Sequence, residues 1–169
     1  MQKILFFLLF FPFLVCASQD LAKTQNYYQI NLGGGLFNIG DGWAHAPVIS
    51  LGKRFGLEDN AAIEVTAAWG EQGENNQPKF RYYALPKISY LKFYPTSVKS
   101  AVFYGGGLSW SKVAQAQQKF EGLFLEGTLG YELQRHVSVH LDIAQPILAQ
   151  NQKGSHPGPA FMLGMSVGF

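Results

Sequence analysis

Apolar and polar positions alternate with a period of two along most of this chain. In a β-strand, every second side chain points to the same face, so each such segment has one apolar face and one face of small or polar residues. The pattern predicts eight strands, at residues 27–38, 47–55, 61–70, 80–94, 101–111, 122–133, 137–144 and 161–169.

The last segment shows the alternation most clearly. The residues between its apolar positions are mostly small or polar, and the segment ends on an aromatic residue. Its apolar row consists of Phe161, Leu163, Met165, Val167 and Phe169.

Nothing in the sequence is available to cover eight apolar strand faces, because no segment has the pattern of an amphipathic helix of useful length. A two-sheet sandwich would turn these faces inward, towards each other. A closed barrel in a membrane would turn them outward to lipid and enclose the charges. Charged residues make up only 14% and aromatic residues 15%, which favours the barrel. We therefore predict an all-β fold, an eight-stranded up-and-down antiparallel transmembrane β-barrel.

The predicted connections and aromatic residues agree with a barrel. Short connections (56–60, 95–100 and 134–136) alternate with longer ones (39–46, 71–79, 112–121 and 145–158), as is typical of transmembrane barrels. Trp69 and Trp110 fall near the longer loops and Trp43 falls within the first of them, whereas several Tyr and Phe residues fall at the opposite strand ends. We expect two aromatic belts at the membrane interfaces. Pro86 cannot donate a ladder hydrogen bond and predicts a bulge.

The polar face carries a set of ionisable residues that the barrel would enclose. Eight strands leave an interior just wide enough to be filled by side chains, and buried charges must pair. Glu64 and Lys87 lie on neighbouring predicted strands and are the expected partners. We interpret the set as a structural polar core that plugs the lumen, and a narrow polar path for water or ions is the alternative. The set is Arg54, Glu64, Lys87, Glu126, Glu132, His140 and Asp142.

The beginning of the chain predicts export. A positive start precedes an unbroken apolar run at 4–15, which is too short to span a membrane as a helix, and small residues follow it. We expect residues 1–17 to be a cleaved secretory signal peptide, 18–26 a periplasmic lead and 27–169 the barrel. Cys16 could instead be a lipoprotein cysteine, although Val15 is bulky for such a site. Thirteen basic and 11 acidic residues nearly balance, and no basic patch suggests nucleic acid as a partner.

These features together resemble the small bacterial outer-membrane β-barrel proteins of the OmpA-, OmpX- and OmpW-like class. The resemblance implies outer-membrane localisation, periplasmic N- and C-termini, and contact with outer-membrane lipid and lipopolysaccharide. It also implies that the terminal strand, Phe161 to Phe169, is the signal read by the barrel-assembly machinery, with periplasmic chaperones acting during biogenesis.

Candidate chemistry is sparse. Ser138, His140 and Asp142 share one strand face, but residues two apart lie about 6.6 Å apart along a strand, too far for a nucleophile-to-base hydrogen bond. The segment 137–169 also lacks the His-x-Ser arrangement of an outer-membrane lipid A deacylase. The four histidines are not spaced for a metal site, and no cofactor is expected. We expect a non-enzymatic, porin-like envelope anchor that presents its outer loops. The alternatives are a narrow polar channel and a lipid A-modifying enzyme.

Overall fold

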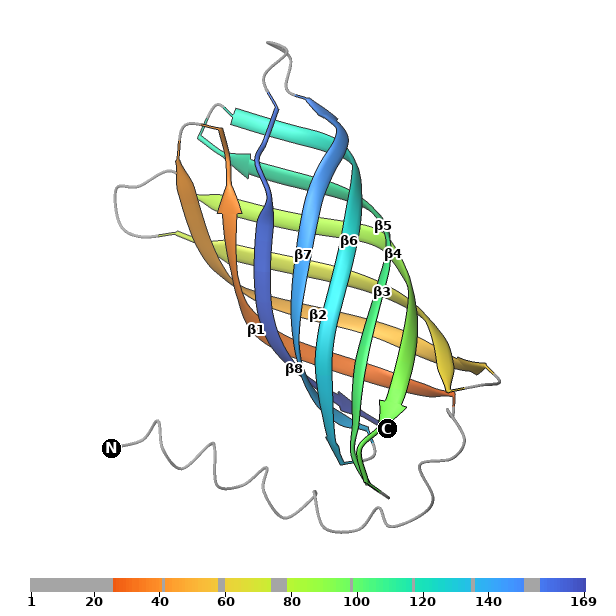
Figure 1. Cartoon of the computed structure of the whole chain (residues 1–169). Coiled ribbons are helices and arrows are strands. Elements are labelled where there is room, and N and C mark those ends of the chain that lie inside the picture. Colours follow the sequence, from red (N-terminus) through yellow and green to blue (C-terminus); the bar gives the residue numbers. More distant parts are fainter. Residues whose placement is uncertain are drawn as a thin grey trace, which may run out of the picture.

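In a computed structural model, the chain forms a closed barrel in which every strand pairs antiparallel with its neighbours in sequence and β1 pairs with β8 (Figure 1). The structure describes residues 26–40, 42–57, 60–73, 79–97, 99–116, 118–134, 136–150 and 156–169. The strands are β1 (Tyr27–Asn38), β2 (Trp43–Leu57), β3 (Ala61–Gln72), β4 (Phe80–Pro95), β5 (Ala101–Gln115), β6 (Gln118–Gln134), β7 (Val137–Gln150) and β8 (Ala160–Gly168). The predicted eight-stranded up-and-down barrel is confirmed.

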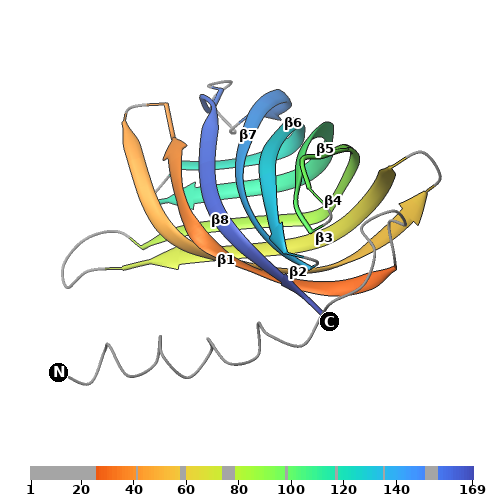
Figure 2. The ribbon, with the colours of Figure 1, turned by 60° about the horizontal axis from the view of Figure 1, so that its bottom comes forward.

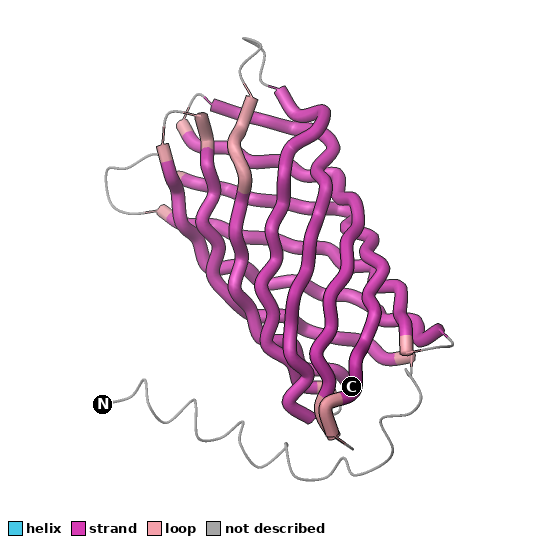
Figure 3. Tube along the Cα trace, in the orientation of Figure 1, coloured by secondary structure: helices cyan, strands magenta, loops and turns pink. Residues whose placement is uncertain are grey.

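The elements of the described chain are strands joined by short connections (Figure 3). Across the described residues, we find no helix with the length and apolar character needed to span a membrane. The predicted signal peptide, residues 1–17, lies outside the described residues, as does nearly all of the predicted lead.

The barrel has two distinct ends. The start of β1 and the end of β8 lie at one end, which we call the terminal end, and the hairpins β1–β2, β3–β4, β5–β6 and β7–β8 lie at the other, the loop end (Figures 1 and 2). Closure at the terminal end is a pair of backbone hydrogen bonds. The Tyr28 N–H donates to the Phe169 carbonyl (3.1 Å), and the Phe169 N–H donates to the Tyr28 carbonyl (2.9 Å).

Several strands are longer than the alternation predicts, mainly at the loop end. β2 begins at Trp43, β5 and β6 leave only residues 116–117 between them, and β7 continues to Gln150. Trp43 was therefore wrongly predicted as a loop residue, and the loops are shorter than expected. The hydrogen-bond ladder needs no apolar residues, so the strands continue beyond the stretch in which one face must be apolar.

Pro86 marks an irregularity in β4, as predicted. The β4–β5 register shifts between Ala84 and Lys87, and the facing β3–β4 register shifts between Thr66 and Ala68. A residue without a backbone N–H is accommodated where the ladder is already interrupted. The register shifts confirm the predicted bulge.

The apolar rows face outward. Leu51, Leu129 and Leu163 are each more than half exposed, whereas Arg54, Glu126 and Asp142 are buried. This arrangement excludes the sandwich, which would reverse the two sets. Val137 departs from the predicted phase: it is 9% exposed although it was expected to face outward. It directly follows a shift in the β6–β7 register between Glu132 and Gln134.

The lumen is layered, and its two ends are apolar rather than polar. At the loop end the ring of Phe37 packs against Phe80 and Tyr82, with centroids 4.9 and 4.7 Å apart. At the terminal end Phe93 packs on Phe103 at 5.2 Å. We call these the loop-end plug and the terminal-end plug. The polar core expected to plug the lumen occupies only its middle, because aromatic side chains fill both ends.

Glycines on the inner face make room for these rings. An added Cβ at Gly35 would lie 2.6 Å from the Phe37 ring, and one at Gly130 would lie 2.2 Å from the Phe103 ring. The rings of Phe37 and Phe103 therefore each lie where an inward-facing position has no side chain. The charged residues form the layer between the two plugs.

Candidate functional site

Arg54 anchors the half of the charged layer that is nearer the terminal end. It lies opposite Glu64 in the β2–β3 register and donates from Nε to Glu64 Oε1 at 2.5 Å. Its Nη1 lies 3.6 Å from Glu132 Oε2. The guanidinium also lies over the rings of Tyr27 (5.1 Å), Phe93 (5.0 Å) and Phe103 (5.6 Å). The planar cation thus joins the terminal-end plug to two carboxylates.

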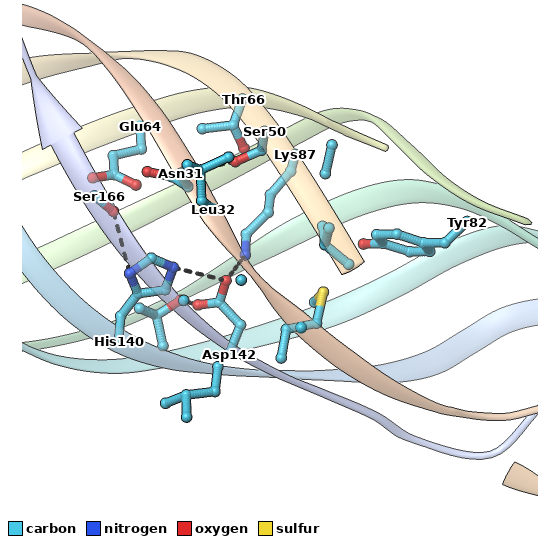
Figure 4. Close-up of a pocket in the computed structure, with 18 of the residues that line it drawn as sticks. Asn31, Leu32, Ser50, Glu64, Thr66, Tyr82, Lys87, His140, Asp142 and Ser166 are labelled. Carbon is cyan, nitrogen blue, oxygen red and sulfur yellow. Dashed lines mark hydrogen bonds and ion pairs between the residues drawn. The ribbon is translucent and has the colours of Figure 1, made fainter. Parts of the chain in front are cut away.

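Lys87 anchors the other half of the layer. Its ammonium donates to Asp142 Oδ2 at 2.7 Å (Figure 4). The same ammonium lies 3.6 Å from Glu126 Oε2. A hydroxyl donates to the other oxygen of each carboxylate. Thr128 donates to Asp142 Oδ1 at 2.6 Å, and Ser109 donates to Glu126 Oε1 at 2.5 Å. Each buried charge here has both an opposite charge and a hydrogen-bond donor or acceptor, the arrangement that buried ions require.

The predicted pairing of Glu64 with Lys87 is wrong. Although the two residues are on neighbouring strands, Glu64 lies opposite Ser89 and Lys87 lies opposite Thr66 in the β3–β4 register. Glu64 instead meets Arg54 directly across β2–β3, and Lys87 extends over the lumen to β7. All seven residues predicted to be enclosed lie on inward-facing positions, from β2, β3, β4, β6 and β7.

His140 joins this layer and contacts a serine that the sequence considerations did not select. Its Nδ1 lies 3.2 Å from Ser166 Oγ on β8, and its Nε2 lies 3.8 Å from Asp142 Oδ2. Ser138, the serine considered from the sequence, is buried on β7 opposite Ser166. The β7–β8 register decides the contact, because it pairs His140 with Gly164, two residues from Ser166. Only a prediction of that register could have identified Ser166.

The space around His140 is small. Its lining includes Asn31, Ser50 and Thr66 from β1–β3, and Figure 4 shows the polar side chains pointing into it. The cavity measures about 50 Å³, which is room for a few water molecules. Tyr82 of the loop-end plug and Phe103 of the terminal-end plug both line it. An acylated or otherwise bulky substrate cannot reach Ser166 through this space.

The histidines are dispersed. His45 contacts Gln72, His136 stacks on Tyr27, and His156 contacts the Ala149 carbonyl. Within the described part of the chain, no group of three or more His, Cys, Asp or Glu residues is arranged to hold a metal ion.

The outer wall carries the remaining predicted features. In the terminal strand the apolar row faces outward, and the exposed fraction of its side chains runs from 37% at Phe161 to 70% at Phe169. Trp43, Trp69 and Trp110 are about half exposed towards the loop end. Tyr28 and Phe169 stack at the terminal end with centroids 6.4 Å apart. Aromatic rings therefore border the aliphatic wall at both ends.

Comparison with known proteins supports the fold but identifies no sequence family. No protein-family model and no curated protein matches the chain. The crystal structure of Neisserial surface protein A is similar with a TM-score of 0.60 and 13% identity, covering 87% of this chain and 99% of that one. Ail, the attachment invasion locus protein of Yersinia pestis, is similar with a TM-score of 0.52 and 14% identity, covering 86% and 100%. Its complex with the heparin analogue sucrose octasulfate gives 0.54 and 13%, with the same coverage.

The closed barrel and its apolar wall define the class of protein. A surface of exposed Leu, Ile and Val bordered by aromatic rings is suited to hydrocarbon and not to water. With this wall, the chain has the fold of the small eight-stranded β-barrels, which it shares with Neisserial surface protein A.

Proposed function

We propose that this protein is a non-enzymatic anchor of the bacterial outer membrane, a rigid barrel that holds its hairpins at the cell surface. The observation that supports this most is the filled lumen. Two aromatic plugs enclose a layer of paired charges and a cavity of about 50 Å³. An interior filled in this way stabilises the wall that carries the hairpins.

The same packing argues against the alternative of a narrow polar channel. A conducting path needs polar groups and water from one end to the other. In the described lumen, Phe37 and Tyr82 are almost fully buried at one end, as is Phe103 at the other. An ion would have to displace these rings and also break the pairs of Arg54 and Lys87.

A lipid A-modifying activity would need a nucleophile at the membrane face. The serine that contacts a histidine, Ser166, is 5% exposed and points into the lumen. Asp142, which would orient His140 in a hydrolytic arrangement, is already paired with Lys87. We infer that these residues are structural.

In this proposal the termini are periplasmic and the loop end faces the exterior. Residues 1–17 would direct export and be removed, leaving 18–26 as a short lead to the barrel at 27–169. The outward row from Phe161 to Phe169 would be read by the barrel-assembly machinery after delivery by periplasmic chaperones. Its high exposure supports this role, because a receptor can reach side chains that the barrel does not bury.

Conductance in planar lipid bilayers tests the proposal. We expect the refolded protein to insert without current steps. Co-flotation of the refolded protein with lipid vesicles shows separately that it inserts. Reproducible current steps of the wild-type protein would overturn the anchor in favour of the channel. A changed lipid A mass spectrum in cells that produce the protein would favour the enzyme.

A further inference from the structure

The outer wall at the loop end carries a cluster of four cations. Arg81 lies on β4, Lys112 on β5 and Lys119 on β6, and Lys79 directly precedes β4. Glu71 forms ion pairs with Lys79 and Arg81, and Glu121 lies 3.6 Å from Lys112 and 3.7 Å from Lys119. We call these six residues the basic patch. Each carboxylate lies between two cations, so each triad carries one positive charge in excess. The four cationic side chains are 39–58% exposed, and they are available to a ligand.

The patch lies at the level where lipid headgroups meet the barrel. Lys112 lies opposite Tyr83, which in turn lies opposite Trp69. Trp110 points outward two residues from Lys112, and its Nε1 lies 3.5 Å from Glu121 Oε1. Tryptophan and tyrosine side chains prefer the membrane interface, so the cations just beyond them face the headgroups rather than the hydrocarbon.

A hollow in the apolar wall begins next to the patch, on the side that faces the terminal end. It is lined on β4 by Pro86, Ile88 and Tyr90 and on β5 by Gly106, Leu108 and Trp110, and we call it the wall groove. Its volume is about 520 Å³. Two features of the sequence produce it: Gly106 has no side chain in an outward-facing row, and the bulge at Pro86 interrupts the neighbouring strand.

We propose that the basic patch and the wall groove together bind one molecule of a bisphosphorylated, multiply acylated glycolipid, the lipid A part of lipopolysaccharide. The two triads would each hold one phosphate, and one acyl chain would occupy the groove. This inference rests on the proposed function, because the loop end must face the outer leaflet. Charge and shape favour this occupant, since phosphates neutralise cations and hydrocarbon fills an apolar hollow. A second copy of the chain is a less favourable occupant, because pairing through this face would bring two positively charged patches together.

The charge arm of the test uses the full mature barrel, refolded in detergent and titrated with purified lipid A by native mass spectrometry. Arg81→Gln/Lys112→Gln removes one cation from each triad and should weaken lipid A binding about tenfold or more. The matched control is Lys53→Gln/Lys92→Gln, which removes two outward-phase cations of the terminal half and should change binding less than about twofold. Equal effects of the two double variants would overturn the inference.

The ligand arm separates lipid A from other occupants. We expect bisphosphorylated lipid A to bind more tightly than its monophosphorylated form, and both to bind more tightly than phosphatidylglycerol. Equal binding of phosphatidylglycerol would show a general anionic-lipid surface and overturn the assignment. A dimer that excludes lipid A from the patch would also overturn it.

The groove arm tests the acyl chain. Leu108→Trp fills the wall groove and should weaken binding of acylated lipid A several-fold without changing binding of the deacylated phosphosugar. Leu129→Trp adds the same bulk to an exposed position of β6 outside the groove and is the control. An equal loss in both variants would contradict the groove.

The heat-dependent gel shift of a folded barrel is measured for every variant. A barrel that folds and stays silent in bilayers but shows no patch-dependent lipid A binding would refute the inference alone. A chain that forms no heat-modifiable barrel would refute the proposed function as well.

Discussion

Lys87 on β4 and Asp142 on β7 form an ion pair across the inside of the barrel, with 2.7 Å between Nζ and Oδ2. The two strands are not neighbours in the closed sheet, so the pair joins opposite parts of the wall. Glu126 shares the same ammonium from β6. One lysine therefore links three strands, and the barrel interior acts as a crosslinked core.

Removing Lys87 should be the most destabilising single change in this layer. Lys87→Met leaves Asp142 and Glu126 as buried carboxylates without their cation, and we expect a loss of about 3–5 kcal/mol in the free energy of unfolding. Guanidinium unfolding in lipid vesicles measures it. The double variant Lys87→Met/Asp142→Asn should lose less than the sum of the two single variants. Additive losses would show that the pair is not coupled.

Arg54→Lys tests whether the shape of the cation matters. Lysine keeps the charge but loses the planar contact with the rings of Tyr27 and Phe103 and the forked contact with two carboxylates, so we expect a loss of about 2 kcal/mol. The same unfolding measurement applies. Lys53→Arg, an outward change of the adjacent residue, should stay within about 0.5 kcal/mol. If Arg54→Lys leaves the free energy of unfolding unchanged, the charge alone explains the contribution of Arg54.

Gly33 and Gly34 form a matched pair of adjacent positions. A Cβ at Gly33 would lie 2.2 Å from the Leu163 carbonyl oxygen on β8, whereas a Cβ at Gly34 meets its nearest atom, the Ala46 carbonyl oxygen, at 4.0 Å. Gly33→Ala must push β1 and β8 apart and should cost about 1–3 kcal/mol. Gly34→Ala should be nearly neutral. Similar unfolding midpoints for both variants would contradict the close approach of the strands.

Phe169 offers a way to separate assembly from stability. Its contacts with Tyr28 are two backbone hydrogen bonds and a ring stack, and Phe169→Ala keeps the hydrogen bonds. We expect several-fold less folded barrel in the outer membrane of cells that produce Phe169→Ala, with little change after refolding in vitro. Tyr28→Ala removes the same stack from the other side and should assemble normally. Equal assembly defects in Phe169→Ala and Tyr28→Ala would show that the lost ring stack, and not the lost terminal aromatic residue, causes the defect.

The sequence predicts the wall of this barrel better than its interior. Leu51, Leu129 and Leu163 face outward as the alternation requires, and Arg54, Glu126 and Asp142 face inward. The error for Glu64 and Lys87 arises because adjacency of strands does not specify which residues lie opposite one another. The aromatic plugs were missed for a related reason: Phe37 and Phe103 lie on the polar face of their strands, where a pattern of alternation does not expect large rings.

The amino-acid sequence by itself determines that the chain forms strands and which face of each strand is apolar. These properties are local, since a period of two follows from the geometry of each strand alone. Only the tertiary structure decides that Lys87 reaches Asp142, that Ser166 meets His140, and that aromatic rings fill both ends of the lumen. Those contacts join residues from different strands, and the register of each strand pair and the closure of the barrel set the distances between them.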